Sequence, residues 1–340
     1  MSAELLRIGI IGTGNIGADH VDRVAHQISG ARVTALFDVA TNRVHELAGQ
    51  VDAVAMATAS HVINSSDVDA VIIASPGEFH APLTLECIAA RKPVLCEKPL
   101  APTVEECEAV IAAEQASGCR LVQVGFMRRN DVGYRHLKDN LTSGAIGEAL
   151  ILHCEHRNPD VPDSFTSEMS MTDSVIHEID TTRWLLDEEI VRVRVIAGKQ
   201  TPNAASHLSD PQLVIMESES GVIVSVEVFV NAKYGYDVRC EVVGSSGFTA
   251  LGTQDLGQYV SETRRSVTMP ANWRIRFGDA YRDEIQDWVN GIAAGEPRGA
   301  NSFDGLCATH VAQAAVRAVK SGATVEVPVL EQPVFYQSSS

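Results

Sequence analysis

The stretch Leu6–Gly17, which reads LRIGIIGTGNIG, places a short apolar run directly before the glycine pattern GxGxxG. A second apolar run, Ala31–Phe37, is followed at once by Asp38. A glycine pattern that follows a strand, opens a helix and precedes an acid at the end of the next strand is the context of a dinucleotide-binding βαβ unit. The glycines let backbone N–H groups approach a pyrophosphate at the helix N-terminus. The sequence therefore predicts an N-terminal Rossmann fold, and the alternative is a glycine turn in a nucleotide-free α/β domain.

Asp38 indicates which dinucleotide to expect. Its carboxylate can hydrogen-bond the adenosine ribose hydroxyls and would repel a 2′-phosphate, so NAD is favoured over NADP. Arg43, five residues later, weakens that preference. The expected contacts of the glycine loop are Gly12, Gly14, Asn15 and Ile16.

Strand-like and helix-like runs alternate between residues 6 and 125, as in a doubly wound parallel sheet. Ala70–Ala74 is apolar throughout, as expected of a strand covered on both faces. The other expected strands are Leu6–Ile11, Ala31–Phe37, Val94–Cys96 and Leu121–Val124, with a short one near Val54–Ala57. The expected helices are Asp19–Ile28, Pro82–Ala90 and Val104–Ser117.

The pattern changes after Gly125, which predicts a nucleotide-binding domain over 1–125 and a second domain over 126–336. A helix is expected near Tyr134–Ser143 and a strand near Ala149–Glu155. The alternating runs that follow are typical of antiparallel strands: Val191–Ile196, Leu213–Glu217, Val222–Val230 and Asp237–Val243. Late helices are expected over Asp283–Ala294 and Asp304–Val319. The predicted fold class is α/β, a Rossmann sheet followed by a mostly antiparallel second domain.

Composition argues against several classes of partner. A net charge of −17 and a pI near 5.0 disfavour nucleic acid and anionic membrane surfaces. No apolar stretch approaches the ~20 residues of a membrane span, and the polar start Met1–Glu4 does not resemble a secretion signal. The seven cysteines are dispersed, and no pair has CxxC or zinc-finger spacing. We therefore expect a cytoplasmic protein with reduced cysteines.

A polar stripe marks the helical segment Thr172–Leu186. Asp173, His177 and Asp180 are spaced i, i+4 and i+7, so on a helix they share one face. An acid one turn before a histidine can orient the imidazole and raise its basicity, as a general base requires. Thr172 is the expected N-cap. The alternatives are a solvated face with an incidental histidine and, less favoured, a Zn or Mn site; we expect no metal.

A lysine is expected at the carboxyl end of the parallel sheet. The stretch Cys96–Leu100 reads CEKPL and ends an apolar strand, at the edge where open α/β sheets bind ligands. There Lys98 can donate to a substrate hydroxyl, and its charge would lower the barrier to removing that proton. Taken alone, Lys98 could equally be a solvated loop lysine.

Together these motifs resemble the Gfo/Idh/MocA family of nicotinamide-dependent sugar and polyol dehydrogenases, over essentially the whole chain. The shared marks are the glycine loop, Asp38, Ser75-Pro76 with His80, Glu97-Lys98-Pro99, and Asp173 with His177. Further stretches are similar to the inositol-oxidising members: Val122–Arg129, His156–Pro159, Val175–Asp180 and Lys233–Asp237.

The resemblance implies a second domain with a large open sheet, whose outer face packs between subunits of a homotetramer. It implies NAD-dependent oxidation of myo-inositol to 2-keto-myo-inositol (scyllo-inosose) by hydride transfer. His177 would be the general base, Asp173 its partner, and Lys98 would polarise the reacting oxygen. The implied substrate contacts are Lys98, Arg128, His156, Asn158, Asp173, His177, Asp180, Tyr236 and Tyr281. Besides the glycine loop, the implied cofactor contacts are Asp38, Arg43, Ser75, Pro76, His80, Glu97, Lys98 and Met127.

Other interpretations of the same residues stay open. His156–Asn158 could simply end a strand, and Tyr234 and Tyr236 would share a strand face that packs between sheets. The enzyme could act on another inositol isomer or an aldose. The chain could instead be a sensor that binds NAD without chemistry, against which the intact Lys98, Asp173 and His177 argue, or a scaffold whose open sheet only mediates assembly.

Overall fold

The computed structural model describes residues 5–252 and 256–337. The chain forms two compact units. The first comprises the chain up to Phe126, Tyr281–Thr309 and the chain from Glu331 onward. The second comprises Met127–Ala280 and His310–Leu330. The sequence did not indicate that the chain returns to the first unit after Ala280.

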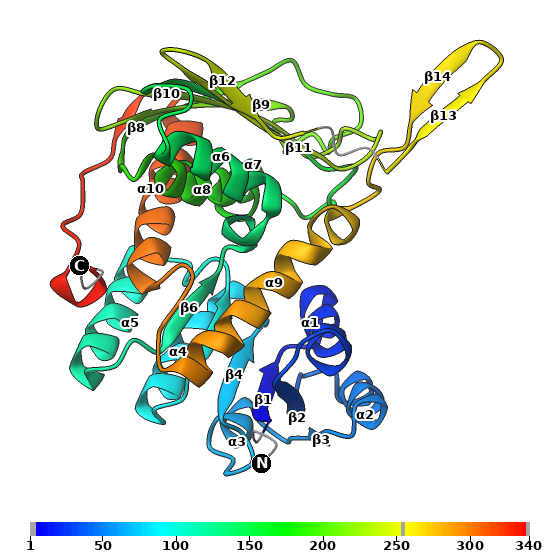
Figure 1. Cartoon of the computed structure of the whole chain (residues 1–340), viewed down its shortest axis with the longest axis vertical. Coiled ribbons are helices and arrows are strands. Elements are labelled where there is room, and N and C mark those ends of the chain that lie inside the picture. The colour runs from blue at the N-terminus through cyan, green and yellow to red at the C-terminus, as the bar shows by residue number, and fades with distance from the viewer. Residues whose placement is uncertain (1–4, 253–255, 338–340) are drawn as a thin grey trace. The chain divides into compact units, whose positions relative to one another are not determined.

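Six parallel strands form the sheet of the first unit, in the order β3-β2-β1-β4-β5-β6 (Figure 1). Their bounds are β1 (Leu6–Ile11), β2 (Ala31–Phe37), β3 (Val54–Ala55), β4 (Ala70–Ile73), β5 (Val94–Glu97) and β6 (Val122–Gly125). The strand order reverses at β1, which pairs with both β2 and β4. Doubly wound sheets bind ligands beyond the carboxyl ends of the strands at such a switch point. The predicted parallel sheet is confirmed.

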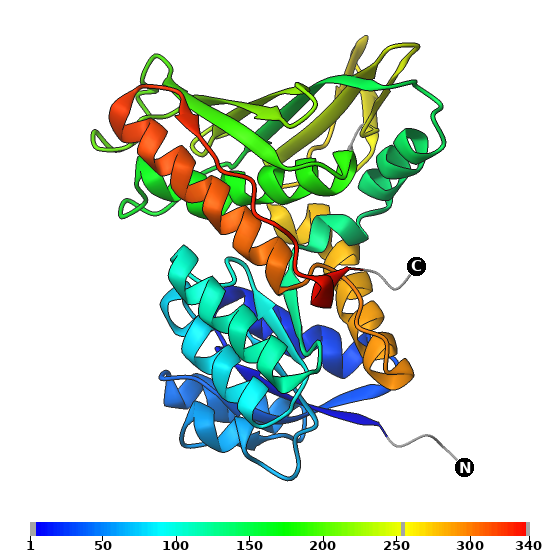
Figure 2. The same cartoon turned by 90° about the vertical axis from the view of Figure 1, so that its left-hand side faces the viewer.

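Helices cover both faces of this sheet. They are α1 (Asn15–His26), α2 (Thr41–Gln50), α3 (Ala59–Ile63), α4 (His80–Ala89), α5 (Val104–Ser117) and part of α9 (Trp273–Ala294). Val21 of α1, Val44 of α2 and Ile285 of α9 join Ile8 in one buried apolar cluster on one face. On the other face α4 and α5 pack side by side (Figure 2). This packing fixes the loops at the carboxyl end of the sheet, which carry the predicted cofactor residues.

Seven strands form the sheet of the second unit, in the order β12-β11-β7-β10-β9-β8-β15. Their bounds are β7 (Ala149–Arg157), β8 (Ile190–Ala197), β9 (Gln212–Ser218), β10 (Ile223–Phe229), β11 (Asp237–Gly244), β12 (Phe248–Ala250) and β15 (Val325–Glu326). All neighbours are antiparallel except β7 and β10, which run parallel. The prediction of a mostly antiparallel sheet is confirmed, and β12 and β15 are additions that the sequence did not indicate.

The second unit contains several helical segments. They are α6 (Val132–Thr142), α7 (Ser167–Met169), the π-helical segment η3 (Ser170–Val175), α8 (Ile176–Leu186) and part of α10 (Ser302–Ser321). The polar stripe lies on two of them, η3 and α8. The predicted N-cap Thr172 is wrong. The helical path begins earlier, where the Thr166 hydroxyl accepts a hydrogen bond from the Met169 N–H at 3.2 Å. Thr172 lies inside the helical path, and its hydroxyl donates to the Glu168 carbonyl.

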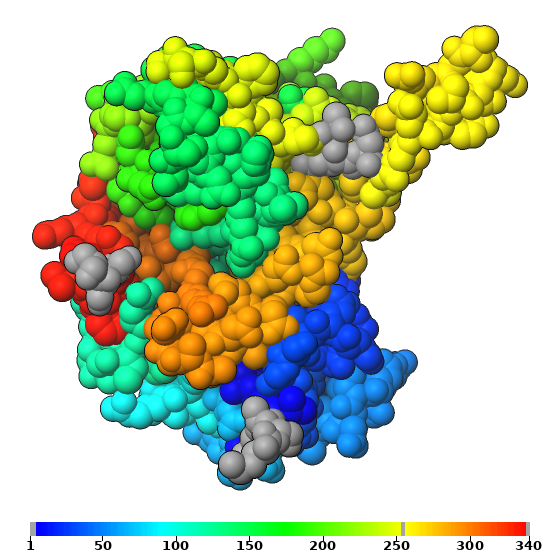
Figure 3. All heavy atoms as spheres, viewed as in Figure 1, coloured from blue at the N-terminus to red at the C-terminus, as the bar shows by residue number. Residues whose placement is uncertain are grey.

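A two-stranded hairpin, β13 (Gln258–Ser261) and β14 (Arg264–Val267), projects from the second unit (Figures 1 and 3). The sequence did not predict it. No helix among the described residues is long and apolar enough to cross a membrane.

Candidate active site

The glycine loop joins β1 to α1 in the first unit. Gly12 has a φ of +92°, and a Cβ there would lie 2.5 Å from the Ser75 backbone nitrogen. A Cβ at Gly17 would clash with the Gly12 carbonyl oxygen. The fold itself therefore requires these two glycines. Gly14 differs, because a Cβ there meets no described atom within 4 Å. Its missing side chain leaves room for a ligand beside the N-terminus of α1.

Asp38, directly after β2, holds the glycine loop in place through hydrogen bonds. Its Oδ2 accepts hydrogen bonds from the Thr13 N–H at 2.6 Å and the Thr13 hydroxyl at 3.2 Å, and its Oδ1 accepts from the Ala40 N–H at 2.9 Å. Burial opposes ionisation of the carboxyl, but these hydrogen bonds and the charge of Arg43 outweigh it and lower its pKa. Arg43 also donates to the Gly14 carbonyl at 3.2 Å. Asp38 is thus an ionised, oriented carboxylate next to the glycine loop.

His80 links two loops at the carboxyl end of the same sheet. Its Nδ1 lies 2.6 Å from the Pro99 carbonyl oxygen, and its Nε2 lies 2.8 Å from the Ser75 carbonyl oxygen. Because both partners only accept, both nitrogens donate and the ring is an imidazolium. Burial opposes that charge, yet Cys96 and the two carbonyls raise the pKa of His80 to about 9.

Lys98 follows β5, and its peptide bond to Pro99 is cis. Its backbone N–H donates to Glu97 at 3.3 Å. Glu97 is buried and accepts from His20 Nε2 at 2.7 Å, while Arg23 donates to His20 Nδ1 at 3.3 Å. Burial raises the pKa of Glu97, but the His20 hydrogen bond and the charge of Lys98 outweigh it and lower that pKa overall. The residue before the lysine is therefore a buried carboxylate held by its own hydrogen bonds.

Tyr281, a predicted substrate contact, belongs to the first unit. The Arg23 guanidinium lies 4.9 Å from the centre of its ring, and the His20 ring packs edge-on at 5.8 Å. These contacts hold Tyr281 against α1 and join it to the residues that support Glu97. A contact between Tyr281 and the substrate stays a prediction.

Asp173 and His177 lie on the helical path of the second unit. Asp173 is in the π-helical segment, and His177 is in the first turn of α8 with 7% of its surface exposed. Val175, Ile176 and Ile179 are fully or almost fully buried, so they form the packing side of this segment. The sequence did not indicate the π-helical turn, because the spacing argument assumes a regular α-helix with 3.6 residues per turn. Turns of this kind are frequent at functional sites.

Behind His177, a buried cluster joins three elements: Arg128 of η2 (Met127–Asn130), His156 of β7 and Glu178 of α8. Glu178 Oε1 pairs with Arg128 Nη1, and both Glu178 oxygens lie 3.0 Å from His156 Nδ1. Burial raises the pKa of Glu178, but Arg128 and His156 outweigh it and lower that pKa. The sequence indicated Arg128 and His156 and missed Glu178. The available signal was its place directly after His177. Adjacent residues on a helix point roughly 100° apart, so a charged residue at this position is expected to lie on a different face from His177.

Tyr236 completes this cluster, with its ring 6.1 Å from that of His156 in an edge-on arrangement. Burial raises the pKa of Tyr236 to about 12, so its phenol is a neutral donor. The expectation that Tyr234 shares its face is wrong, because Tyr234 is half exposed and Tyr236 is buried. Both precede β11, and Gly235, with a φ of +140°, turns the backbone between them.

The remaining predicted residues of the second unit have partners of their own. Asp180 is 1% exposed and pairs with Arg129 through two hydrogen bonds, of 2.6 and 3.1 Å. Asn158 follows β7, where its backbone bonds to Phe229 and Ala232. Met127 is buried at the start of η2. Of the predicted residues, the structure brings Arg128, His156, His177 and Tyr236 together, with the two histidine ring centres 6.4 Å apart.

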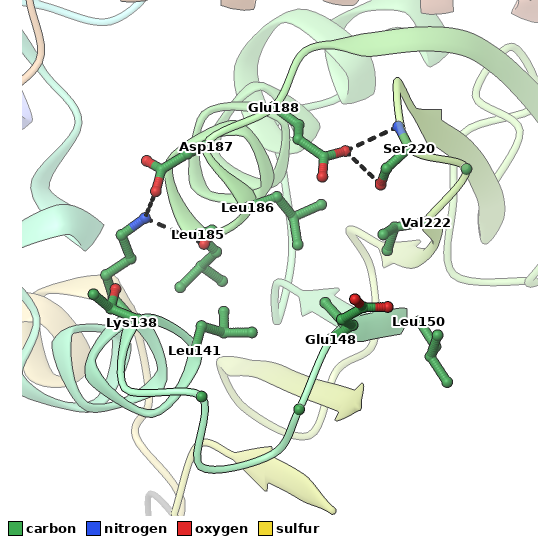
Figure 4. Close-up of a pocket in the computed structure, with 15 residues that line it drawn as sticks. Lys138, Leu141, Glu148, Leu150, Leu185, Leu186, Asp187, Glu188, Ser220 and Val222 are labelled. Atoms are coloured by element: carbon green, nitrogen blue, oxygen red, sulfur yellow. Dashed lines mark hydrogen bonds and ion pairs between the residues drawn. The ribbon is translucent and has the colours of Figure 1, made fainter. Parts of the chain in front are cut away.

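A pocket of about 840 Å³ opens at the other end of α8 (Figure 4). Leu141, Leu186 and Val222 line it, and its charged side chains are partnered, Lys138 by Asp187 and Glu188 by Ser220. None of the predicted site residues lines this pocket. It is therefore not the predicted substrate site.

The alternative of a metal site gains no support. Among residues 5–252 and 256–337, no three His, Cys, Asp or Glu side chains are grouped to hold a metal ion. Asp180, which the alternative requires, is engaged by Arg129.

Two family models match the chain. The model of the oxidoreductase family with an NAD-binding Rossmann fold matches residues 6–126, and the Gfo/Idh/MocA C-terminal domain matches residues 134–249. The chain belongs to the Gfo/Idh/MocA family. The loops of this Gfo/Idh/MocA protein fit the NAD that its Rossmann domain implies. Gly14 leaves space at the N-terminus of α1, and the buried Ser75 hydroxyl has no hydrogen-bond partner in the described part of the chain.

Relatives of this Gfo/Idh/MocA chain match it over nearly its full length. Inositol 2-dehydrogenase 3 of Saccharopolyspora erythraea is 45% identical over 97% of this chain and 98% of the relative. The myo-inositol dehydrogenase of Lactobacillus casei, solved with NAD(H) and myo-inositol, is 34% identical, with a TM-score of 0.95 over 98% of this chain and all of that one. The scyllo-inositol dehydrogenase of the same organism, solved with NAD(H) and scyllo-inositol, is 26% identical, with a TM-score of 0.90 over 95% and 99%.

Proposed function

We propose that this protein oxidises myo-inositol to 2-keto-myo-inositol (scyllo-inosose) with NAD+ as the acceptor. The observation that carries the proposal is the pairing of two sites in one chain. One unit has a glycine loop fastened by an ionised Asp38. The other has His177 next to a buried polar cluster suited to a polyol. The names of the relatives and solved structures described above support the same substrate class.

The first unit supplies the residues that would hold the cofactor. The N-terminus of α1, with Gly12, Gly14, Asn15 and Ile16, is suited to the pyrophosphate. Asp38 is suited to the adenosine ribose, near Arg43. The remaining proposed contacts are Ser75, Pro76, His80, Glu97, Lys98 and Met127. When bound, NAD+ supplies a hydride acceptor.

In the proposed mechanism, His177 removes the proton from the reacting hydroxyl. Asp173 holds the imidazole in the required tautomer and stabilises the imidazolium that forms. Lys98 donates a hydrogen bond to the same oxygen, and its charge stabilises negative charge that develops there. The carbon that bears this oxygen would lose its hydrogen as a hydride to bound NAD+ and become the carbonyl carbon of the ketone.

The other hydroxyls need partners, because a buried hydroxyl left unpaired costs about 1–3 kcal/mol. His156, Asn158, Asp180 and Tyr236 are the proposed direct contacts, with Tyr281 as a further one. Arg128 is enclosed between Glu178, Tyr134 and the Phe277 ring. This favours an indirect role, in which Arg128 holds these neighbours in position, over direct contact with the substrate.

The test is NADH formation with myo-inositol, scyllo-inositol, other inositols, glucose and xylose, each with NAD+ and NADP+. Strong activity on myo-inositol with NAD+ supports the proposal. Activity confined to scyllo-inositol, whose dehydrogenase shares this fold, or to an aldose would contradict the substrate and keep the chemistry. NAD binding without any turnover would favour a sensor.

We propose further that copies of the chain associate as a homotetramer through the outer face of the seven-stranded sheet. Ile223 and Leu213 are partly exposed there, on neighbouring strands. Light scattering of the wild type and of Ile223→Glu tests this, and a wild-type monomer would contradict it. The seven free cysteines are consistent with a reducing, cytoplasmic location.

A further inference from the structure

His156 Nδ1 has three polar atoms around it. Both Glu178 oxygens lie at 3.0 Å, and Arg128 Nη2 lies at 3.2 Å. The ring nitrogen can donate to the carboxylate or accept from the guanidinium, but it cannot do both. In a neutral ring, whether Nδ1 carries the proton decides whether Nε2, at the opposite edge, accepts or donates a hydrogen bond.

The geometry favours donation to Glu178. A lone pair at Nδ1 would face two carboxylate oxygens, and the lowered pKa of Glu178 means that they are charged. Arg128 keeps its ion pair with Glu178 through Nη1 whichever way the histidine is protonated, so donation by Nδ1 costs it only the longer contact of Nη2 with a neutral ring nitrogen. A hydrogen bond to a carboxylate is also stronger than one between neutral groups. The proton therefore belongs on Nδ1.

The charge balance of the cluster favours a neutral ring. Arg128 and Glu178 have side chains that are both 1% exposed, and their charges cancel. The other titratable groups against this pair are neutral: burial raises the pKa of the Tyr134 and Tyr236 phenols, and the Cys240 hydrogen bond and burial raise the pKa of the Cys154 thiol. A positive charge on His156 would leave two cations, Arg128 and His156, sharing the single carboxylate of Glu178, and an excess of buried charge is costly.

We infer that Glu178, itself fixed by Arg128, holds His156 as the Nδ1–H tautomer, so that Nε2 is a hydrogen-bond acceptor for a hydroxyl of the polyol. No described residue hydrogen-bonds His156 Nε2. The His177 ring centre is 6.4 Å away, close enough for both rings to reach hydroxyls of one six-membered polyol. Glu178 and Arg128 are thus positioning residues. The assignment of the acceptor to a substrate hydroxyl rests on the proposed function.

Nitrogen NMR of the full-length protein, labelled with ¹⁵N-histidine, tests the tautomer without any substrate. We expect His156 to show a protonated Nδ1 and a bare Nε2 at neutral pH, with the signals assigned by their loss in His156→Gln. A protonated Nε2, whether alone or together with Nδ1, would overturn the inference. This result does not depend on the oxidation of inositol, so it separates the inference from the proposed function.

Kinetics of Glu178→Gln test the consequence. The amide can donate to Nδ1, which would move the ring proton to Nε2 and remove the acceptor. We expect the KM for myo-inositol to rise by about tenfold or more, with a smaller fall in kcat and an unchanged KM for NAD+. Glu188→Gln, at the opposite end of α8, is the matched control and should leave all three unchanged. A folded Glu178→Gln with a wild-type KM would overturn the role.

Loss of the buried carboxylate leaves Arg128 charged and unpaired, so Glu178→Gln can fail to fold. The double variant Arg128→Met/Glu178→Gln removes both charges together and keeps the volume. It should show the same rise in KM and the loss of the Nδ1–H tautomer by NMR. A wild-type tautomer in that variant would show that neither residue positions His156.

Discussion

The carboxylate of Asp38 accepts a hydrogen bond from the backbone N–H of Thr13 at 2.6 Å. The residue expected to select the cofactor is therefore also the residue that fastens the glycine loop. The Thr13 hydroxyl and the Ala40 N–H add two further donors, so the protein itself fixes the orientation of the carboxylate. We therefore expect the selection of NAD and the shape of its loop to depend on one side chain.

Asp38→Ala should impair both roles. We expect the KM for NAD+ to rise by about tenfold or more, and the preference for NAD+ over NADP+ to shrink, because the charge that repels a 2′-phosphate is gone. Asp38→Asn is the control, since its amide oxygen can still accept from Thr13. It should relax the preference with a smaller rise in the KM for NAD+. Initial rates with both cofactors measure this, and an alanine variant that still rejects NADP+ would contradict it.

His177→Ala should reduce kcat by about 100-fold or more, because the reacting hydroxyl loses the general base that we propose for it. NAD+ affinity should stay nearly unchanged, since the glycine loop belongs to the first unit. Steady-state rates and NAD+ titration by tryptophan fluorescence measure the two effects. The hairpin variant Tyr259→Ser serves as a control that leaves kcat unchanged. Wild-type turnover in His177→Ala would remove this residue from the base role.

The parallel sheet could be predicted from the sequence because its strands are short apolar runs with glycine or acid signals at their ends. β1 and β2 have the predicted bounds, and α5 begins and ends as predicted. The parallel pairing of β7 and β10 could not be predicted, since it depends on a crossover through the 65 residues between Arg157 and Ile223, not on any local pattern.

Residue spacing alone indicated candidates only where one element carries the pattern, whereas Arg128, His156 and Tyr236 were expected only from the family resemblance. His177 and Asp173 are close in sequence, so helical spacing indicates their shared face. Glu178 was missed because its partners, Arg128 and His156, lie on other elements, and only tertiary packing joins them. The spacing argument also could not show that Asp180 is paired with Arg129.

Tyr336→Phe should cost about 1 kcal/mol of unfolding free energy, the typical net value of one hydrogen bond. Its hydroxyl donates at 2.7 Å to Glu114, which is fully buried and also accepts from Ser302, Leu121 and Val122. Glu114→Ala should cost roughly 3 kcal/mol or more, because buried donors then lose their acceptor. Denaturant unfolding measures both. Equal costs for the two variants would contradict a shared acceptor.

The contribution of His80 to stability should disappear in alkaline solution. Its pKa is raised from 6.5 to about 9 in the folded protein, because its two ring nitrogens donate to Ser75 and Pro99 and Cys96 lies nearby, against the opposing effect of burial. The folded state therefore binds the proton more tightly than the unfolded state. The resulting stabilisation, on the order of 3 kcal/mol, is fully present below pH 6.5 and is lost as the pH rises through 9.

The measurement is the difference in unfolding free energy between the wild type and His80→Leu at several pH values from about 6 to about 10. Leucine cannot titrate, and the other ionisable groups are common to both proteins, so their pH dependence cancels in the difference. We expect the difference to shrink steadily above neutral pH. A difference that stays constant over the whole range would mean that His80 is neutral when folded. One of the two carbonyls would then lack its donor.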